Sequence, residues 1–397
     1  MLTDPTPRPP RCYDPTTAPH HEAGAVQIYD HRTVRGLLRD PQRVTSDVTE
    51  MLTPEQRDHL HPVSSFVWAT DRKTISGCPG RHAALRSAMA PWFNPQEVAN
   101  QRRAAQATCN RTTTEPGRPF DVYGDYALPL VTHYMAGWLG IEPADVTYAV
   151  DDQLAAGDLF DSWPPLATPE MDGHYRSLMA RPQLGGVAAA ARELVGSGVL
   201  TERESWGIVY SIAVSAVATA TTITLATGLS VEHDRWPHMI DAEAARGAVE
   251  EAIRFGNPFP HTSRFVREPF TVGDLQLQPG DQVLLWLTAA NRDLPGPHRQ
   301  PLDRFDPWRD NTQQVGWGSG YHLCGGVHHA RSLAEVAVTT LARRHPNLGL
   351  GGPWKRFVGI DDRFVTAPAV NRRQRLTSTR HARSRCRHPG SKTPYAR

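Results

Sequence analysis

The stretch Val315–Val336, VGWGSGYHLCGGVHHARSLAEV, surrounds a single cysteine, Cys324, with five glycines. Glycine is favoured where the backbone adopts a positive φ or approaches a flat ligand closely, and a buried structural cysteine needs neither. A helix-forming segment, GVHHARSLAEVAVTTLARR, begins directly after the cysteine. The N-terminus of a helix stabilises a thiolate through its partial charge and free N–H groups. The loop therefore predicts a thiolate presented to a large planar partner such as haem iron. The alternative is a free core cysteine with incidental glycines.

The segment Trp317–Gly326, WGSGYHLCGG, resembles the haem-ligand loop of the cytochrome P-450 family, an aromatic residue followed by G-x-G-x-H-x-C-x-G. The resemblance implies haem b (iron protoporphyrin IX) with Cys324 as its axial ligand. It also implies that Trp317, Gly318, His322 and Gly326 contact the cofactor. The family usually has phenylalanine where this chain has Trp317, at a ring position that lies against the thiolate. An indole there is an uncommon substitute that can alter the potential of the iron.

Further motifs match the same family, in the family's order. EEAIR contains Glu251 and Arg254, which share one face of a predicted helix. The resemblance implies that these two residues form a buried ion pair near the haem loop, whereas in most proteins such a spacing gives only a surface pair. NRD (291–293) and DRFDPWR (303–309) resemble the family's segment between sheet and haem loop.

Four side chains match the donors with which the family holds the two haem propionates. RHAALR places His82 and Arg86 four residues apart, Arg264 lies in HTSRFV, and His322 lies in the haem-ligand loop. Four donors for two carboxylates are chemically sensible, although each residue taken singly is more often a surface cation. The resemblance is dense over 245–345, recognisable over 60–130 and loose elsewhere.

The predicted central helix, Thr201–Gly228, departs from the family's pattern A-G-x-[D/E]-[T/S], whose acid and alcohol relay protons to bound dioxygen. Counting back from Glu251 places this pattern at 213–217, with Ala216 for the acid and Val217 for the alcohol. A register shifted to Thr221 or Thr222 also lacks an acid, because the helix has no Asp or Glu after Glu204. Protons must then come from water, substrate or peroxide. Either the acid is dispensable, or ordinary aliphatic hydroxylation is not the reaction.

The distal pocket is expected between the segment before His82, residues near 155–180, the central helix and NPFPHT (257–262). Aromatic side chains in these segments can stack on an aromatic substrate, although each is also explained by plain core packing. The predicted pocket residues are Trp68, Trp163, Tyr210, Ala213, Val214, Val217, Phe259 and His261.

The rest of the chain supplies the elements that position these residues. Up to about residue 245, apolar residues recur three or four apart, which predicts helices. The central helix has a capping box from Thr201 and Glu204, is apolar nearly all round, and is expected to end at Gly228. After Glu250, short β-type runs are broken by VGD and PGD turns. The predicted helical segments are DHRTVRGLLRD, RHAALRSAMAPWF, PQEVANQRRAAQATCN, LPLVTHYMAGWLG, TPEMDGHYRSLMA and GGVAAAARELVGSG.

The composition is that of an ordinary soluble globular protein: 397 residues, 39% hydrophobic and 21% charged. Five scattered cysteines without a CxxC pair fit a reducing compartment and build no multi-cysteine metal site. No apolar run is expected to reach the roughly 20 residues that span a bilayer. The Pro-rich N-terminus lacks the apolar centre of a secretory signal. We therefore expect a cytoplasmic protein that does not bind a membrane.

The positive charge of the C-terminal segment offsets a net negative charge on the rest of the chain. From residue 371 onward the chain carries nine Arg and Lys and no acid, while the net charge of the whole is +2. Such a tail can bind nucleic acid or an anionic surface, but without apolar periodicity a disordered, solvated terminus is favoured, and no nucleic-acid partner is expected. We divide the chain into a flexible lead-in (1–24), a haem domain (25–370) and this tail (371–397).

The resemblance implies the mostly α, single-domain haem-thiolate fold with a smaller β region. It implies electrons from a ferredoxin or flavodoxin with its reductase, docking on the proximal face of what we expect to be a monomer. The cations expected at that face are Arg102, Arg103, His328 and Arg331.

Family members without the acid–alcohol pair often act in natural-product pathways. The leading prediction is therefore oxidative aryl cross-linking (C–C, C–N or C–O) of an aromatic small molecule or peptide. One alternative is a conventional monooxygenase that hydroxylates a small natural-product intermediate by a water relay, and another is a peroxide-driven oxygenase. An alternative of a different class is a haem-binding recruitment scaffold without turnover.

Overall fold

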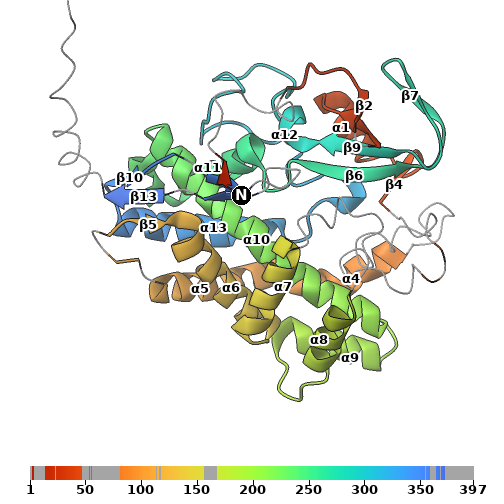
Figure 1. The fold of residues 1–397 in the computed structure, drawn as a ribbon. Helices are drawn as coiled ribbons and strands as arrows, with labels where there is room; N and C mark the ends of the chain where they lie inside the picture. The colour runs from red at the N-terminus through yellow and green to blue at the C-terminus, as the bar shows by residue number, and fades with distance from the viewer. Residues whose placement is uncertain are drawn as a thin grey trace, which may run out of the picture.

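The computed structural model describes residues 2–3, 14–22, 24–46, 53, 55, 81–112, 114–115, 118–155, 168–353, 355–357, 364–366 and 368–371. Most helices gather around one long central helix, and a smaller sheet region lies beside them (Figure 1). The α-helices are α1 His31–Leu37, α4 Arg81–Phe93, α5 Pro95–Arg111, α6 Leu128–Leu139, α7 Pro143–Ala155, α8 Pro169–Met179, α9 Gly186–Gly196, α10 Glu202–Glu232, α11 Ala242–Gly256, α12 Leu287–Ala290 and α13 Val327–Arg344.

The strands are short and form four small sheets in the described part of the chain. They are β1 Leu2–Thr3, β2 His20–Glu22, β3 Ala25–Ile28, β4 Val44–Thr45, β5 Phe120–Asp121, β6 His261–Val266, β7 Phe270–Val272, β8 Leu275–Leu277, β9 Gln282–Trp286, β10 Leu348–Leu350, β11 Lys355–Phe357, β12 Phe364–Thr366 and β13 Pro368–Asn371. The expected mostly α fold with a smaller β region is confirmed.

The central helix, α10, begins with the predicted capping box. Thr201 Oγ1 accepts from the N–H of Glu204 at 3.2 Å, and Glu204 Oε2 accepts from the N–H of Thr201 at 2.8 Å. The expected end at Gly228 is wrong: the helix continues to Glu232, because the residues that follow the glycine are buried in the same core. α10 packs against α6, α7, α9, α11 and α13, which explains why it is apolar on several faces.

By length and composition α10 could cross a membrane, which corrects the expectation that no apolar run is long enough. Within the fold, 78% of its most apolar window is buried. The other helices of the region have bounds close to the predicted ones, and α4 spans the predicted segment RHAALRSAMAPWF.

The largest sheet has the strand order β2-β3-β9-β6-β4. β3 and β9 are parallel, and the other neighbours are antiparallel. The predicted glycine turns are present, since Gly273 and Gly280 have φ values of 56° and 96°. Two strands, β1 and β2, fall within the expected lead-in and pair with the body of the protein. Residues 372–397 lie outside the described part, so the prediction of a disordered tail stays a prediction.

Two apolar cores flank the loop that carries Cys324. The larger is built from the helices, and the smaller lies between the sheet and α1 and includes Val315 from the loop itself. The Val315 N–H donates to Asn291 Oδ1 at 2.8 Å, which fastens the loop just before its glycine-rich part. The loop is therefore held between the two cores and leads directly into α13.

Candidate functional site

Cys324 ends a tight loop whose shape is set by backbone hydrogen bonds. Its N–H donates to Trp317 O at 2.9 Å, and the Gly318 N–H donates to Val315 O at 2.8 Å. Gly318 and Gly320 have φ values of 79° and 69°, a region that glycine adopts without steric cost. A Cβ at Gly320 would also lie 2.7 Å from a backbone oxygen of α1's C-terminal end. Two of the five glycines are therefore required by the turn itself.

The half-buried Cys324 lies just before the N-terminus of α13. Burial raises the pKa of its thiol; a hydrogen bond from the Gly326 N–H and the charges of Arg86 and Arg331 lower that pKa. A helix N-terminus with nearby guanidinium groups is the setting that stabilises an anionic sulfur in proteins. The sulfur is thus surrounded by the donors and cations that a thiolate ligand needs.

Arg86 reaches the loop from α4. Its Nη2 donates to Leu323 O at 3.0 Å. A Cβ at Gly325 would lie 2.6 Å from Arg86 Nη1, so the glycine leaves room for the guanidinium beside the residue that follows Cys324.

The other predicted propionate donors lie around His322. The rings of His82 and His322 are 4.7 Å apart, and Arg264 and His322 line one pocket together with Tyr321. Arg264 Nη1 donates to Thr262 Oγ1 at 3.0 Å and Ser263 O at 2.7 Å. Ser46 Oγ lies 3.0 Å from His322 Nε2. Sequence reasoning missed Ser46, because no motif connects it to the loop.

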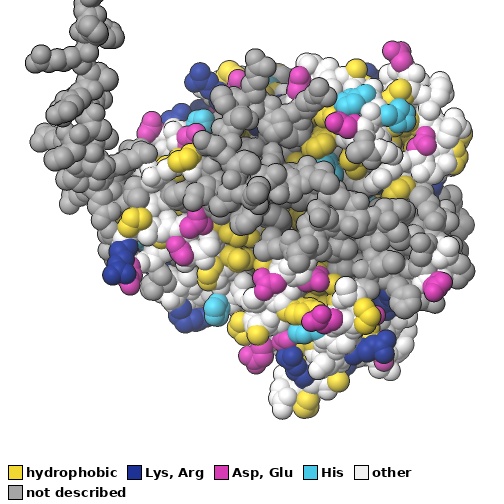
Figure 2. Space-filling view, viewed as in Figure 1, with side chains coloured by type: hydrophobic (Ala, Val, Ile, Leu, Met, Phe, Trp, Pro, Cys, Tyr) yellow, Lys and Arg dark blue, Asp and Glu magenta, His cyan; other side chains and the backbone are white. Residues whose placement is uncertain are grey.

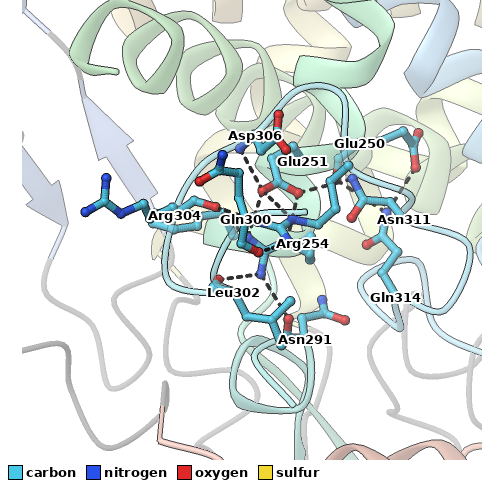
Figure 3. A network of polar contacts seen from close by, with 12 residues as sticks. Glu250, Glu251, Arg254, Asn291, Gln300, Leu302, Arg304, Asp306, Asn311 and Gln314 are labelled. Carbon is cyan, nitrogen blue, oxygen red and sulfur yellow. Dashed lines mark hydrogen bonds and ion pairs between the residues drawn. The ribbon is translucent and has the colours of Figure 1, made fainter. Parts of the chain in front are cut away.

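Glu251 is the centre of a buried polar network (Figure 3). Arg254 donates to its two oxygens at 2.7 and 2.8 Å, and both side chains have 0% exposed area. Arg309, Asn311 and the N–H of Asp306 also donate to this carboxylate. Arg254 in turn donates to the carbonyls of Asn291, Leu302 and Arg304. This pair therefore fixes the loop that precedes Cys324.

Glu250, the residue before Glu251, accepts hydrogen bonds from the cysteine loop itself. Its Oε2 accepts from Trp317 Nε1 at 3.2 Å, Gln314 Nε2 at 3.0 Å and Arg331 Nη2 at 3.0 Å, and its Oε1 accepts from Arg331 Nε. The Arg331 guanidinium lies 5.5 Å from the centroid of the Trp317 ring. No local motif indicates this role, because the partners of Glu250 lie 64 to 81 residues away in the chain.

One face of α10 is left partly open. From Ser205 to Val231 every residue is buried except Ser211, Val214, Ser215 and Ala218, which recur at i, i+3, i+4 and i+7. In the register counted back from Glu251, the acid position, Ala216, is fully buried, and that register stays a prediction. A register on the open face would place the family pattern at SAVAT (215–219), with Ala218 for the acid and the buried Thr219 for the alcohol. Thr219 Oγ1 donates to Ser215 O at 3.0 Å.

Only part of the predicted pocket lies on open surface. Val214 belongs to the open face of α10, whereas Ala213, Val217 and Tyr210 are packed in the helical core. The Tyr210 hydroxyl donates to Asp152 Oδ2. Phe259 is 45% exposed, and His261 packs edge-on against Trp286 at 4.6 Å. Trp68 and Trp163 lie outside the described residues.

Two of the cations predicted at the proximal face, Arg102 and Arg331, are held by acids on neighbouring helices. Arg102 and the exposed Arg246, which sequence reasoning missed, bind the two oxygens of buried Glu335 at 2.6 and 2.9 Å. Arg103 donates to Asn100, and His328 is exposed. Figure 2 shows acidic and basic side chains interspersed over the helical part of one face.

Comparison with known proteins points to one family, although no protein-family model matches the chain. The chain is 25% identical to erythromycin C-12 hydroxylase of Saccharopolyspora erythraea, over 82% of this chain and 83% of that protein. It is 29% identical to a cytochrome P450 of Bacillus subtilis, over 71% and 72%. The fold matches CYP164A2 of Mycobacterium smegmatis with a TM-score of 0.73 at 22% identity, covering 89% of this chain and 93% of that one.

CYP164A2 shares the fold described above, and members of the cytochrome P450 family hold haem on a cysteine thiolate. The chain combines that fold with a cysteine at the start of α13 and four cationic or imidazole side chains around the same loop. It belongs to the cytochrome P450 family and is an oxidoreductase enzyme.

Proposed function

We propose that this protein holds haem b on Cys324 and uses it to cross-link aromatic groups in a small molecule or peptide of specialised metabolism. The observation that carries the proposal is the open face of α10, where Ala218 stands at the position of the family's acid. No carboxylate lies on α10 between Glu204 and Glu232. The bond formed is C–C, C–N or C–O.

The residues around the cysteine loop fit the cofactor. Cys324 would bind the iron, and His82, Arg86, Arg264 and His322 would bind the two propionates. Two guanidinium groups and two imidazoles match two carboxylates in charge and in donor geometry. When bound, a thiolate-ligated haem supplies the oxidising power, because the thiolate favours O–O cleavage.

The hydroxyl groups on and beside the open face are poor sources of protons. Ser215 Oγ donates to Ile212 O at 2.6 Å, and Thr219 Oγ1 donates to Ser215 O at 3.0 Å. Both hydroxyl protons are therefore engaged by backbone carbonyls and must be released before they can be passed on. Because α10 itself carries no carboxylate between Glu204 and Glu232, the proton that either hydroxyl gives up would be replaced from water or substrate.

A phenol or indole substrate can itself take part in the proton relay, because its O–H or N–H is a proton donor. Each of two aromatic groups loses one hydrogen atom, as an electron and a proton, and the two resulting radicals join. Dioxygen is the oxidant: the two hydrogens, with two electrons from the redox partner and two protons from solvent, reduce it to two molecules of water. The product is then lighter by two hydrogens and contains no added oxygen. Val214 and Ser215 offer a small apolar and polar surface on α10, which leaves room for flat rings.

A conventional monooxygenase is the second candidate, and Thr219 favours it. Its hydroxyl occupies the alcohol position of the family pattern, so that only the acid is missing. A relative named erythromycin C-12 hydroxylase shows that hydroxylation occurs among proteins of similar sequence. Ordered water would then take the place of the acid.

We expect the electrons to come from a partner protein. Bacterial relatives generally use ferredoxin-type partners. We place the docking of a ferredoxin or flavodoxin, itself reduced by its reductase, at the face that carries Arg102, Arg103, His328 and Arg331. The protein would act as a monomer in the cytoplasm, where reduced partners and free thiols are maintained.

The test is turnover of aromatic and aromatic-peptide substrates under labelled dioxygen, with a ferredoxin and its reductase. Cross-linking predicts a product two hydrogens lighter without label, and hydroxylation predicts one labelled oxygen. A labelled hydroxylated product as the sole product contradicts the proposal. If neither product forms and no substrate shifts the haem absorption, the result favours a haem-binding recruitment scaffold without turnover.

A further inference from the structure

Trp317 has a single polar atom, and the structure shows where it is directed. The indole Nε1–H donates to Glu250 Oε2 at 3.2 Å. Indole is a donor only, so this bond uses the one hydrogen that Trp317 offers. The backbone bond from Cys324 N–H to Trp317 O, at 2.9 Å, keeps the ring on the loop that surrounds the sulfur.

Arg331 completes the arrangement from the other side. It donates to both oxygens of Glu250, and its guanidinium lies over the Trp317 ring at 5.5 Å from the centroid. Glu250 has 17% of its side chain exposed and Arg331 has 34%, so both groups are partly buried. The three residues, from α11, the loop and α13, form one clamp, which we call the indole clamp.

The direction of this N–H matters because hydrogen bonds to a ligating sulfur tune the metal. A donor that bonds the thiolate withdraws electron density from it and raises the reduction potential of the iron. A phenylalanine, the usual residue at this position in the family, has no such donor. Tryptophan therefore adds a hydrogen-bond donor at this position of the loop. The effect of this donor on the sulfur depends on the direction of the indole N–H.

We propose that Glu250 is a positioning residue, which holds the Trp317 indole N–H away from the Cys324 sulfur and so preserves the electron donation of the thiolate. Glu250 does this through the indole clamp, by accepting from Trp317 Nε1 and from Arg331. The inference rests on the proposed role of Cys324 as the haem ligand.

The first measurement needs no haem. In protein labelled with ¹⁵N-tryptophan, the Trp317 indole resonance is assigned from its loss in Trp317→Phe. Glu250→Ala should shift this resonance and increase its hydrogen exchange, whereas Glu250→Gln, whose amide oxygen can still accept, should keep the exchange slow. Glu243→Ala removes an exposed carboxylate from the same helix and should change nothing. An unchanged resonance in Glu250→Ala overturns the clamp.

The second measurement is the potential of the haem protein, with the iron–sulfur stretching frequency recorded by resonance Raman. Glu250→Ala should raise the potential and lower the stretching frequency, with a shift in the reduction equilibrium of about tenfold, which is about 59 mV for one electron. Glu250→Gln should give a smaller shift, because it loses the charge but keeps the acceptor.

A double-mutant cycle isolates the indole. In a Trp317→Phe background, Glu250→Ala should shift the potential no more than Glu250→Gln does. Equal shifts of the Ala variant in the Trp and Phe backgrounds would contradict the inference, since the effect would then come from charge alone. Absence of a thiolate-type carbon monoxide spectrum in the unmodified protein would instead refute the ligand assignment, whatever the indole resonance shows.

Discussion

Glu250 and Glu251 are consecutive residues of α11, yet their carboxylates support different loops (Figure 3). Glu251 accepts from Arg254, Arg309 and Asn311 and holds the segment before the cysteine loop. Glu250 accepts from Gln314, Trp317 and Arg331 and holds the cysteine loop itself. One turn of one helix therefore sets the position of the loop that carries Cys324 from two sides.

Replacing Glu251 by glutamine should destabilise the protein strongly. Arg254 is fully buried, and removing its anion leaves an uncompensated charge in the core, at a cost of roughly 3–5 kcal/mol. The apparent free energy of unfolding by urea measures the loss. Glu250→Gln is the matched control and should cost less, because Arg331 is one-third exposed. Equal losses in the two variants would contradict the account of this network.

Gly247→Ala tests how closely α11 packs on the loop that Glu251 holds. A Cβ at Gly247 would overlap the carbonyl oxygen of Pro307, and the loop would have to move. Overpacking of this kind costs about 1–3 kcal/mol, which a thermal or urea unfolding curve detects. Gly196→Ala, where a Cβ would meet nothing within 4 Å, should be neutral or slightly stabilising. A neutral Gly247→Ala would show that the loop is not in firm contact with α11.

Ala218→Asp should restore the missing acid at the open face of α10. We expect insertion of oxygen into substrate to rise, by up to about 10²-fold if the carboxylate relays protons, with a change in product ratio measured by mass spectrometry. Ala216→Asp is the control: this position is fully buried, so the variant should lose stability without gaining hydroxylation. If Ala216→Asp increased oxygen insertion and Ala218→Asp did not, the register counted back from Glu251, with Ala216 at the acid position, would be supported instead.

The protein should lose stability on mild acidification. Burial lowers the pKa of His329, opposed by a hydrogen bond to the Trp92 carbonyl and the charge of Glu97. Burial likewise lowers the pKa of His174, His233 and His345. The unfolded chain then takes up protons first, so the free energy of unfolding is unaffected above the unfolded pKa of about 6.5 and falls as the pH drops below it.

Urea unfolding at a series of pH values measures this slope. His329→Gln should make the slope between about pH 6.5 and 5 shallower, because one group that differs between the two states is removed. An identical slope in the variant would mean that His329 titrates alike in folded and unfolded protein.

Local signals in the sequence were sufficient for much of the fold. The capping box of Thr201 and Glu204 and the glycine turns at Gly273 and Gly280 depend on neighbouring residues only, and the structure contains them. The stop at Gly228 failed because tertiary burial of the next three residues outweighs the preference of glycine for helix ends.

The site could be predicted where a motif fixes the spacing, as for Glu251 and Arg254 or the loop around Cys324. No motif fixes the α10 register, because counting back from Glu251 crosses the connection between α10 and α11, whose length the sequence pattern does not fix. Ser46 and Glu250 were missed for a similar reason: their partners are distant in the chain and meet them only in the folded protein.

The most direct test of the account is the carbon monoxide difference spectrum of the reduced, haem-loaded protein and of Cys324→Ser. We expect that the unmodified protein shows the thiolate band from which the family takes its name, and that Cys324→Ser, which keeps the shape of the loop, loses this band. Cys109→Ser, at a buried cysteine of the helical core, should retain the band. Persistence of the band in Cys324→Ser would contradict the assignment of Cys324 as the ligand of the iron.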